Sequence, residues 1–190
     1  MKKNQKDFLP LSGKKIVLGV TGSIAAYKSA DLTSSLVKQG ASVQTILTDC
    51  AKQFITPKTL GTLSGKTVCN DLWSHNNHNQ PDHIEVADWA DLLLIAPASA
   101  NCIAKCTHGI ADDFLSCVYL ATESPVLIAP AMNGKMYQHS TTQRNLHILK
   151  EQQIKIIEPV FGLLACGYEG IGKLAPLDSI VKAILKTSKP

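Results

Sequence analysis

The stretch Lys14–Gly40, KKIVLGVTGSIAAYKSADLTSSLVKQG, predicts a β-strand, a turn and an α-helix in direct succession. Residues 14–20 are a β-branched apolar run, which is typical of a strand buried on both faces. A Gly22-Ser23 turn follows, and apolar residues at helical spacing then lead to Gly40, a typical helix C-cap. This order is the first half of a βαβ unit.

The rest of the chain repeats this alternation. We expect strands at residues 14–20, 42–48, 91–99, 125–132 and 154–160. We expect helices after the Gly-Ser turn and at 84–90, 101–122 (either continuous or broken near Gly109), 141–153 (led by a Thr cap) and 177–187, and a short helix with a turn over 51–65. Polar residues 73–83 predict a long loop, and residues 161–176 predict a Gly-rich loop.

This alternation predicts a Rossmann-like or flavodoxin-like doubly wound parallel sheet in a single-domain, three-layer αβα fold. We expect a flexible N-terminal arm over residues 1–13 and one domain over residues 14–187. Ligands of such folds bind beyond the carboxyl ends of the strands, so the functional residues should lie in the loops that follow strands.

The composition excludes several classes of protein. The chain has 190 residues and a net charge of +4, but its lysines are scattered and Arg144 is its only arginine, which argues against nucleic-acid binding. No apolar run approaches the ~18 residues of a membrane span. The N-terminus lacks the apolar core of a secretory signal, and the six cysteines form no CxxC pair. We therefore expect a cytoplasmic protein with reduced thiols and no membrane partner.

The Gly22-Ser23 turn can bind an anion, because free backbone N–H groups and a helix dipole face the ligand there. Ser23 can cap the helix or donate to a phosphate, and a simple N-cap turn explains the stretch equally well. The stretch is neither a GxGxxG fingerprint nor a P-loop. A dinucleotide remains a rival ligand, since Asp49 can meet a ribose hydroxyl.

Two further loops follow expected strands. In APASANCIAK (residues 96–105), Ser99 and Asn101 can bond the edge of a planar heterocycle or cap the next helix. PAMNGKMY (residues 130–137) places two methionines and an asparagine within five residues. That loop either re-enters the core or forms a pocket wall for a flat apolar ligand, with one amide aimed at a polar group.

His83 lies at the junction of a loop and a structured segment, which suits a general base. His75 and His78 are expected to be solvated loop residues. The histidines of the first of two His and Cys groups match no zinc-site spacing, and cysteines at i and i+4 on an apolar helix, as in the second group, are usually core residues, so we expect no metal. These groups are His75, His78 and His83, and Cys102, Cys106 and His108.

Cys166 lies in a segment with glycines at 162, 167, 170 and 172. Such a segment can be a mobile lid that delivers a thiol, or simply a hairpin with a half-buried cysteine.

Five stretches resemble, in order, the flavin-dependent cysteine decarboxylase family over about residues 14–185. They are TGSIAAYK, HIEVADWAD, APASANCIAKCTHGIADD, PAMNGKMY and ACGYEGIGKLA. The resemblance implies FMN, bound by strand-end loops. The implied cofactor-binding residues are Gly22, Ser23, Ile24, Thr48, Phe54, Ser99, Ala100 and Asn101.

The resemblance also implies the active-site residues. His83 is the implied base or electrostatic partner, Asn133 the substrate-orienting amide, and Cys166 an acid on a substrate-covering flap. Ala131, Met132 and Met136 would contact the substrate beside Asn133. The chain departs from the family pattern at Tyr137, where tryptophan is usual, and at Tyr168, where an acidic residue is usual.

Within the family, the chain is most similar to the coenzyme A branch. The implied reaction converts 4′-phospho-N-pantothenoylcysteine to 4′-phosphopantetheine and CO2, through oxidation to a thioaldehyde and re-reduction of the ene-thiol. The implied assembly is a trimer or dodecamer with active sites between subunits. The alternatives are a peptidyl-cysteine decarboxylase, a more distant flavin prenyltransferase, or a non-catalytic flavoprotein regulatory subunit. The chain is too short for the synthetase domain of many bacterial members, so it is either monofunctional or truncated.

Overall fold

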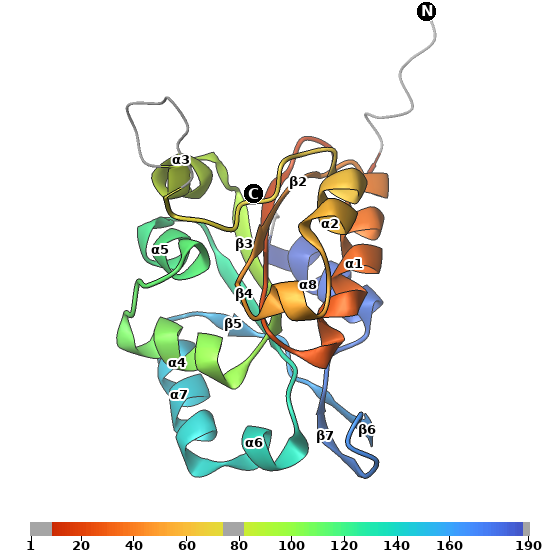
Figure 1. The fold of residues 1–190 in the computed structure, drawn as a ribbon, viewed down its shortest axis with the longest axis vertical. Coiled ribbons are helices and arrows are strands. Elements are labelled where there is room, and N and C mark those ends of the chain that lie inside the picture. The colour runs from red at the N-terminus through yellow and green to blue at the C-terminus, as the bar shows by residue number, and fades with distance from the viewer. Residues whose placement is uncertain (1–8, 74–81, 188–190) are drawn as a thin grey trace, which may run out of the picture.

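The computed structural model describes residues 9–73 and 82–187, in which a parallel five-stranded sheet lies between two helical layers (Figure 1). The sheet consists of β1 (Lys15–Val20), β2 (Ser42–Leu47), β3 (Leu92–Ala98), β4 (Val126–Pro130) and β5 (Lys155–Ile156). The strand order is β2-β1-β3-β4-β5, so the winding reverses between β1 and β3. This order confirms the expected doubly wound αβα fold and puts a ligand crevice beyond β1 and β3.

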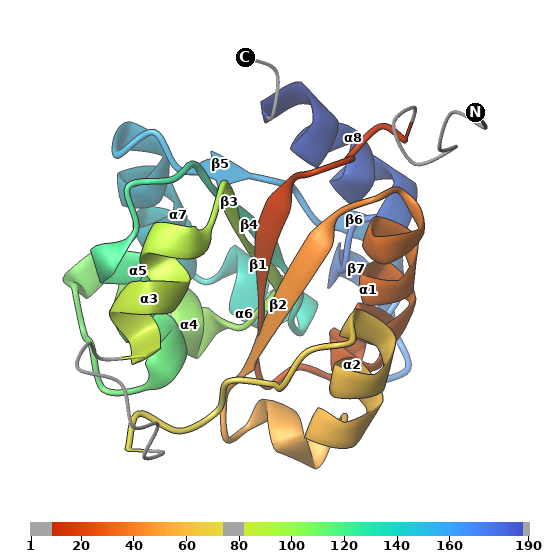
Figure 2. The same ribbon diagram turned by 90° about the horizontal axis from the view of Figure 1, so that it is seen from above.

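Both faces of the sheet are covered (Figure 2). One layer contains α1 (Lys28–Lys38), α2 (Pro57–Ser64) and α8 (Leu177–Thr187). The other layer contains α3 (Asp82–Trp89), α4 (Ala100–His108), α5 (Phe114–Ala121) and α7 (Ser140–Glu151). Successive strand residues point into opposite layers, so Leu93 and Leu94 are both fully buried but belong to different core clusters. This burial explains why the strands read as continuous apolar runs.

The expected helix over residues 101–122 is two helices. Gly109 ends α4 with a left-handed φ of +67°, which glycine adopts without steric cost. Asp113 then starts α5 through a capping box with Ser116.

The C-terminal third differs most from expectation. The predicted single strand over residues 154–160 is wrong: Lys155–Ile156 joins the parallel sheet, whereas Val160 begins a different strand, and Pro159 between them has no N–H to donate to a ladder. Much of the expected loop over residues 161–176 is an antiparallel hairpin of β6 (Val160–Leu163) and β7 (Glu169–Lys173). The cap of α7 is His139 rather than a threonine, and its Nδ1 accepts from Thr141 N at 3.2 Å.

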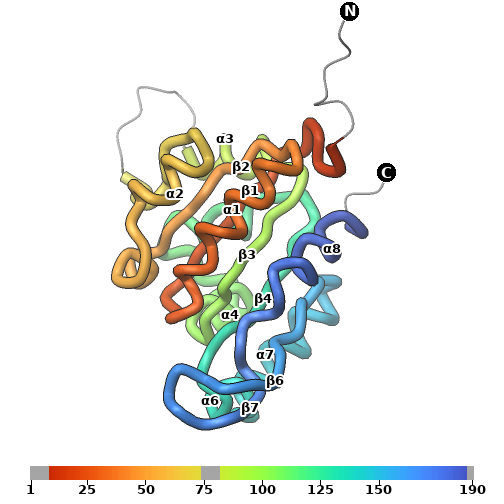
Figure 3. Tube along the Cα trace, turned by 90° about the vertical axis from the view of Figure 1, so that its right-hand side faces the viewer, coloured from red at the N-terminus to blue at the C-terminus, as the bar shows by residue number. Residues whose placement is uncertain are grey.

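Three short helices complete the fold: η2 (Ile24–Tyr27), η3 (Ala51–Gln53) and α6 (Gly134–Gln138). Helix α6 and the hairpin lie side by side at one end of the molecule (Figures 1 and 3). That end is where β1, β3 and β4 terminate.

The expected N-terminal arm does not extend to residue 13. Leu11 is fully buried, and its N–H donates to Gln39 O at 2.9 Å, because its apolar side chain joins the core beside α1. Residues 1–8 lie outside the described residues, as do His75 and His78. Across the described ranges, no helix is both long enough and apolar enough to cross a bilayer.

Candidate functional site

Thr21 joins the two strand ends at the point where the winding reverses. Its Oγ1 donates to Pro97 O at 2.8 Å and accepts from Ser99 N at 2.8 Å, and the residue is almost completely buried. These bonds hold the loop after β1 against the loop after β3. Sequence reasoning missed Thr21, although it opens the quoted stretch TGSIAAYK.

The Gly22-Ser23 turn is tightly packed. A Cβ on Gly22 would lie 2.5 Å from Cys50 Cβ, so no larger residue fits without a shift of the loop after β2. Ser23 Oγ accepts from Ala25 N at 3.3 Å and therefore caps η2. A hydroxyl that accepts one bond still has a hydrogen to donate, so Ser23 can also donate to a ligand.

A cavity of about 610 Å³ lies between these loops, α6 and the hairpin. This volume is within the usual range for small-molecule sites. Eleven residues singled out from the sequence line it: Gly22, Ser23, Ile24, Phe54, Ser99, Ala100, Ala131, Met132, Asn133, Met136 and Cys166. The fold therefore gathers segments that are up to 144 residues apart around one space.

Other lining residues were not singled out from the sequence. Lys28 and Tyr27 come from η2 and the start of α1, and Lys173 comes from β7. All three lie inside quoted stretches, TGSIAAYK and ACGYEGIGKLA. The charge of the two lysines and the aromatic ring of the tyrosine were the features by which the sequence could have identified them as site residues.

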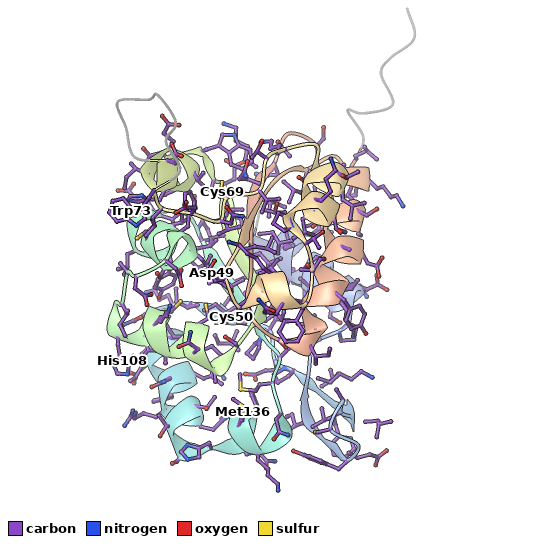
Figure 4. All side chains as sticks on the ribbon, viewed as in Figure 1. Asp49, Cys50, Cys69, Trp73, His108 and Met136 are labelled. Carbon is purple, nitrogen blue, oxygen red and sulfur yellow. The ribbon has the colours of Figure 1, made fainter. Side chains whose placement is uncertain are left out.

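A smaller cavity of about 190 Å³ adjoins the larger one through the shared residue Ser99. Thr48 and Asn101 line this smaller cavity instead of the larger one. Asp49 and Cys50 also line it, and Figure 4 shows them beyond the end of β2, above Met136 on α6.

One wall of the smaller cavity is charged. Lys105 Nζ lies 2.6 Å from Asp112 Oδ1 and 2.8 Å from Asp113 Oδ2. Burial alone would raise the pKa of Asp113, but the Lys105 ammonium and the bonds from Ser116 outweigh it and lower that pKa. Within residues 9–73 and 82–187, no three His, Cys, Asp or Glu side chains form a metal-binding group.

Asn133 is the centre of a hydrogen-bond network over the larger cavity. Its Oδ1 accepts from Lys135 N at 2.9 Å and from Tyr168 Oη at 2.9 Å. Two donors at Oδ1 fix the amide orientation, so Nδ2 points to Cys166 Sγ at 3.2 Å. The asparagine of PAMNGKMY thus caps α6 and places a donor at the thiol.

The hairpin rests directly on the loop that contains Asn133. Met132 N donates to Gly172 O at 3.0 Å. A Cβ on Gly172 would lie 2.3 Å from Met132 O, and a Cβ on Gly134 would lie 2.8 Å from Ile171 O. Gly172 and Gly134 therefore permit close backbone packing.

Tyr168 and Tyr137, the two residues that depart from the family pattern, both form side-chain hydrogen bonds. Tyr168 bonds Asn133, as described, and Tyr137 Oη donates to Glu158 Oε2. Burial raises the pKa of Tyr137, and the Glu158 carboxylate raises it further. Lys150 Nζ also binds Glu158, at 2.7 Å.

His83 lines neither cavity. It lies on α3, where its ring meets Phe114 edge-on with centroids 6.4 Å apart. Helix α3 is at the far end of the molecule from α6 and the hairpin (Figures 1 and 3). A single chain thus brings Asn133 and Cys166 together but leaves His83 elsewhere.

Comparison with known proteins gives consistent matches. The sequence profile described as Flavoprotein matches residues 7–189. The chain is 46% identical over 172 residues to the coenzyme A biosynthesis bifunctional protein CoaBC of Bacillus subtilis, covering 90% of this chain and 42% of that protein. It is 47% identical to the probable phosphopantothenoylcysteine decarboxylase of Streptococcus mutans, covering 90% of this chain and 97% of that protein. The chain therefore spans about two fifths of the CoaBC relatives.

Solved structures agree with the sequence matches. The FMN-dependent cysteine decarboxylase SpaF aligns with a TM-score of 0.82 at 31% identity, over 92% of this chain and 97% of that one. A cysteine-to-serine mutant of a PPC decarboxylase, complexed with pantothenoylaminoethenethiol, aligns with a TM-score of 0.81 at 32% identity, over 90% and 96%.

Proposed function

The chain belongs to the Flavoprotein family, and from this premise we propose that it is an FMN-dependent phosphopantothenoylcysteine decarboxylase. The proposed reaction converts 4′-phospho-N-pantothenoylcysteine to 4′-phosphopantetheine and CO2 in coenzyme A biosynthesis, in the cytoplasm. The observation that carries it is the Asn133 amide held 3.2 Å from Cys166 Sγ at a cavity of about 610 Å³, a usual size for a small-molecule site. The Streptococcus mutans relative supports the same activity, since its name states it.

The cavity suits FMN. Apolar residues form most of its wall, while Gly22, Ser23 and Lys28 offer a backbone turn, a hydroxyl and a cation for a phosphate. The proposed cofactor-binding residues are Gly22, Ser23, Ile24, Thr48, Phe54, Ser99, Ala100 and Asn101. Thr48 and Asn101 belong to the adjoining smaller cavity, so their contact requires a cofactor that reaches past Ser99. When bound, FMN would supply reversible hydride-transfer chemistry for the cysteine end of the substrate.

The protein's own groups orient the substrate and move protons. Oδ1 of Asn133 already accepts two bonds, so Nδ2 is the group that can hold the substrate carboxylate. Cys166 is proposed to protonate the substrate carbon in the reductive half of the reaction. Ala131, Met132 and Met136 are proposed to pack beside the substrate, and all three line the cavity.

His83 is proposed to serve a neighbouring subunit. Its absence from the lining of both cavities of one chain supports a trimer, or a dodecamer of trimers, in which α3 of one copy completes the site of another. Such a head-to-tail interface closes into a ring. Single variants His83→Asn and Cys166→Ser should each fail to form 4′-phosphopantetheine. When they are unfolded and reassembled together in equal amounts, about a quarter of the sites should carry both native residues. Absence of recovered activity would place His83 in its own chain's site or outside catalysis.

The direct test is mass spectrometry of 4′-phospho-N-pantothenoylcysteine after incubation with the purified protein and no reductant. Loss of CO2 to give 4′-phosphopantetheine is the expected result. Unchanged substrate with a yellow, FMN-loaded protein would favour a peptidyl-cysteine decarboxylase or a regulatory subunit. Unchanged substrate with a colourless protein would overturn the cofactor assignment. Cys166→Ser should release CO2 but accumulate the ene-thiol.

A further inference from the structure

The larger cavity has two charged residues in its lining, Lys28 and Lys173, and no carboxylate among the described residues. A cavity with two cations and no anion favours a ligand with negative charge. The two lysines come from different walls. Lys28 begins α1 beside the Gly22-Ser23 turn, whereas Lys173 ends β7 on the hairpin that carries Cys166.

The backbone at Lys173 is fixed by a hydrogen bond to the preceding residue, Gly172. Gly172 O accepts from Met132 N at 3.0 Å, so the backbone next to Lys173 is anchored to the wall of the cavity. The lysine stem lies over Gly162. A Cβ on Gly162 would be 3.6 Å from Lys173 Cδ and 3.8 Å from its Nζ. Within the described ranges, no carboxylate forms an ion pair with this ammonium.

We infer that Lys173 binds the phosphate of the substrate, at the opposite end from the cysteine that Asn133 and Cys166 handle. This inference rests on the proposed function, whose substrate carries a phosphate and a thiol at its two ends. A lysine ammonium that has no acidic partner is a suitable phosphate donor, and a charge-assisted bond is stronger than a neutral one.

The dimensions agree with this assignment. Gly162 lies four residues before Cys166, which corresponds to at most about 13 Å of hairpin at ~3.3 Å per residue. The substrate between its phosphorus and its sulfur is about as long as four extended residues, or roughly 15 Å when fully stretched. One substrate can therefore reach both the Lys173 ammonium and the Cys166 thiol along the same hairpin.

The assignment gives Lys173 a role in specificity. A peptide that ends in cysteine has no phosphate to offer, so the ammonium would contribute nothing to its binding. Lys28 lies beside the turn that is proposed to bind the cofactor phosphate. Of the two lysines in the cavity lining, Lys173 is therefore the one available to the substrate phosphate.

The experiment compares 4′-phospho-N-pantothenoylcysteine with its unphosphorylated form in the FMN-loaded holoenzyme. Lys173→Met should lower kcat/KM about tenfold or more for the phosphorylated substrate, as expected for loss of a bond to a charged group, and leave the unphosphorylated one unchanged. Lys173→Arg should retain most of the preference. Lys182→Met is the matched control, since Lys182 is exposed on α8 and does not line the cavity.

Calorimetric binding of 4′-phosphopantetheine and of pantetheine supplies a readout besides turnover. The native protein should bind the phosphorylated compound more tightly, and Lys173→Met should remove that difference. If the native enzyme decarboxylates the substrate but Lys173→Met keeps the full phosphate preference in both assays, Lys173 is not the phosphate site and the proposed function stands. If the native protein neither turns over the substrate nor binds 4′-phosphopantetheine, both proposals fail.

Discussion

Replacing Gly172 with alanine should undock the hairpin from the loop that contains Asn133. The added Cβ would lie 2.3 Å from Met132 O, while real Cβ contacts do not fall below about 3.0 Å, so the strand must retreat by at least ~0.7 Å. Gly172 also has a φ of +144°, which side chains rarely adopt.

The cost can be divided into two parts. Holding an alanine in this glycine-favoured backbone region costs about 1–3 kcal/mol. Weakening the bond from Met132 N to Gly172 O adds about 0.5–1.5 kcal/mol. A sum of roughly 1.5–4.5 kcal/mol lowers the docked population by about 10- to 2000-fold relative to the undocked one.

Gly167→Ala is the matched control in the same hairpin. Gly167 also has a positive φ, +87°, but a Cβ there would meet nothing within 4 Å. Gly167→Ala therefore introduces backbone strain of about 1–2 kcal/mol without a steric clash.

The assay is hydrogen exchange by mass spectrometry on the peptide that spans residues 160–173, together with turnover. Gly172→Ala should speed exchange in that peptide and reduce turnover far more than Gly167→Ala, while exchange in β1 and β3 stays unchanged. Equal effects of the two substitutions would refute the reasoning, because the clash would then have no consequence.

Two further substitutions test the polar contacts. Tyr168→Phe removes one of the two hydrogen bonds at Asn133 Oδ1 and should destabilise the docked hairpin by about 0.5–1.5 kcal/mol. Hydrogen exchange over residues 160–173 should become faster while the melting temperature stays unchanged. Unaltered exchange would show that this bond does not hold the hairpin. Asp113→Asn keeps an N-cap residue but loses the charge beside Lys105, and should destabilise the fold by about 1–2 kcal/mol at pH 7 in thermal unfolding. The folded pKa of Asp113 is lowered, so its contribution to stability is present above the unfolded pKa of about 3.9 and is lost as the pH falls through the folded pKa. The stabilities of the two proteins should therefore converge below about pH 4. A constant difference in stability at all pH values would contradict the ion-pair explanation.

The αβ alternation was readable from the sequence because it depends on local patterns. A continuous apolar run such as residues 14–20 reports burial on both faces, and the period of the following segment reports a helix. The closing helix Leu177–Thr187 has the predicted bounds for the same reason.

The sequence left a mobile Gly-rich lid and a hairpin as alternatives for residues 161–176, because the evidence for the hairpin is not local. Strands β6 and β7 exist through pairing with each other, and their glycines lack the side chains on which strand patterns depend. Gly172 was counted among the glycines of a predicted Gly-rich loop, yet a Cβ on it would approach a backbone carbonyl too closely, as would a Cβ on Gly134.

Local sequence patterns were enough to predict the layered fold and the segments that flank the cavity, and the family resemblance supplied the candidate residues. How these residues combine became visible in the folded chain. It oriented the Asn133 amide through two donors, one of them 35 residues away in the chain, and it placed the Lys173 ammonium on the cavity wall. It also separated His83 from Asn133 and Cys166. The physical reason is that residue type and spacing report local conformation, whereas the direction of a hydrogen bond and the approach of two backbones depend on segments that meet only when the chain has folded.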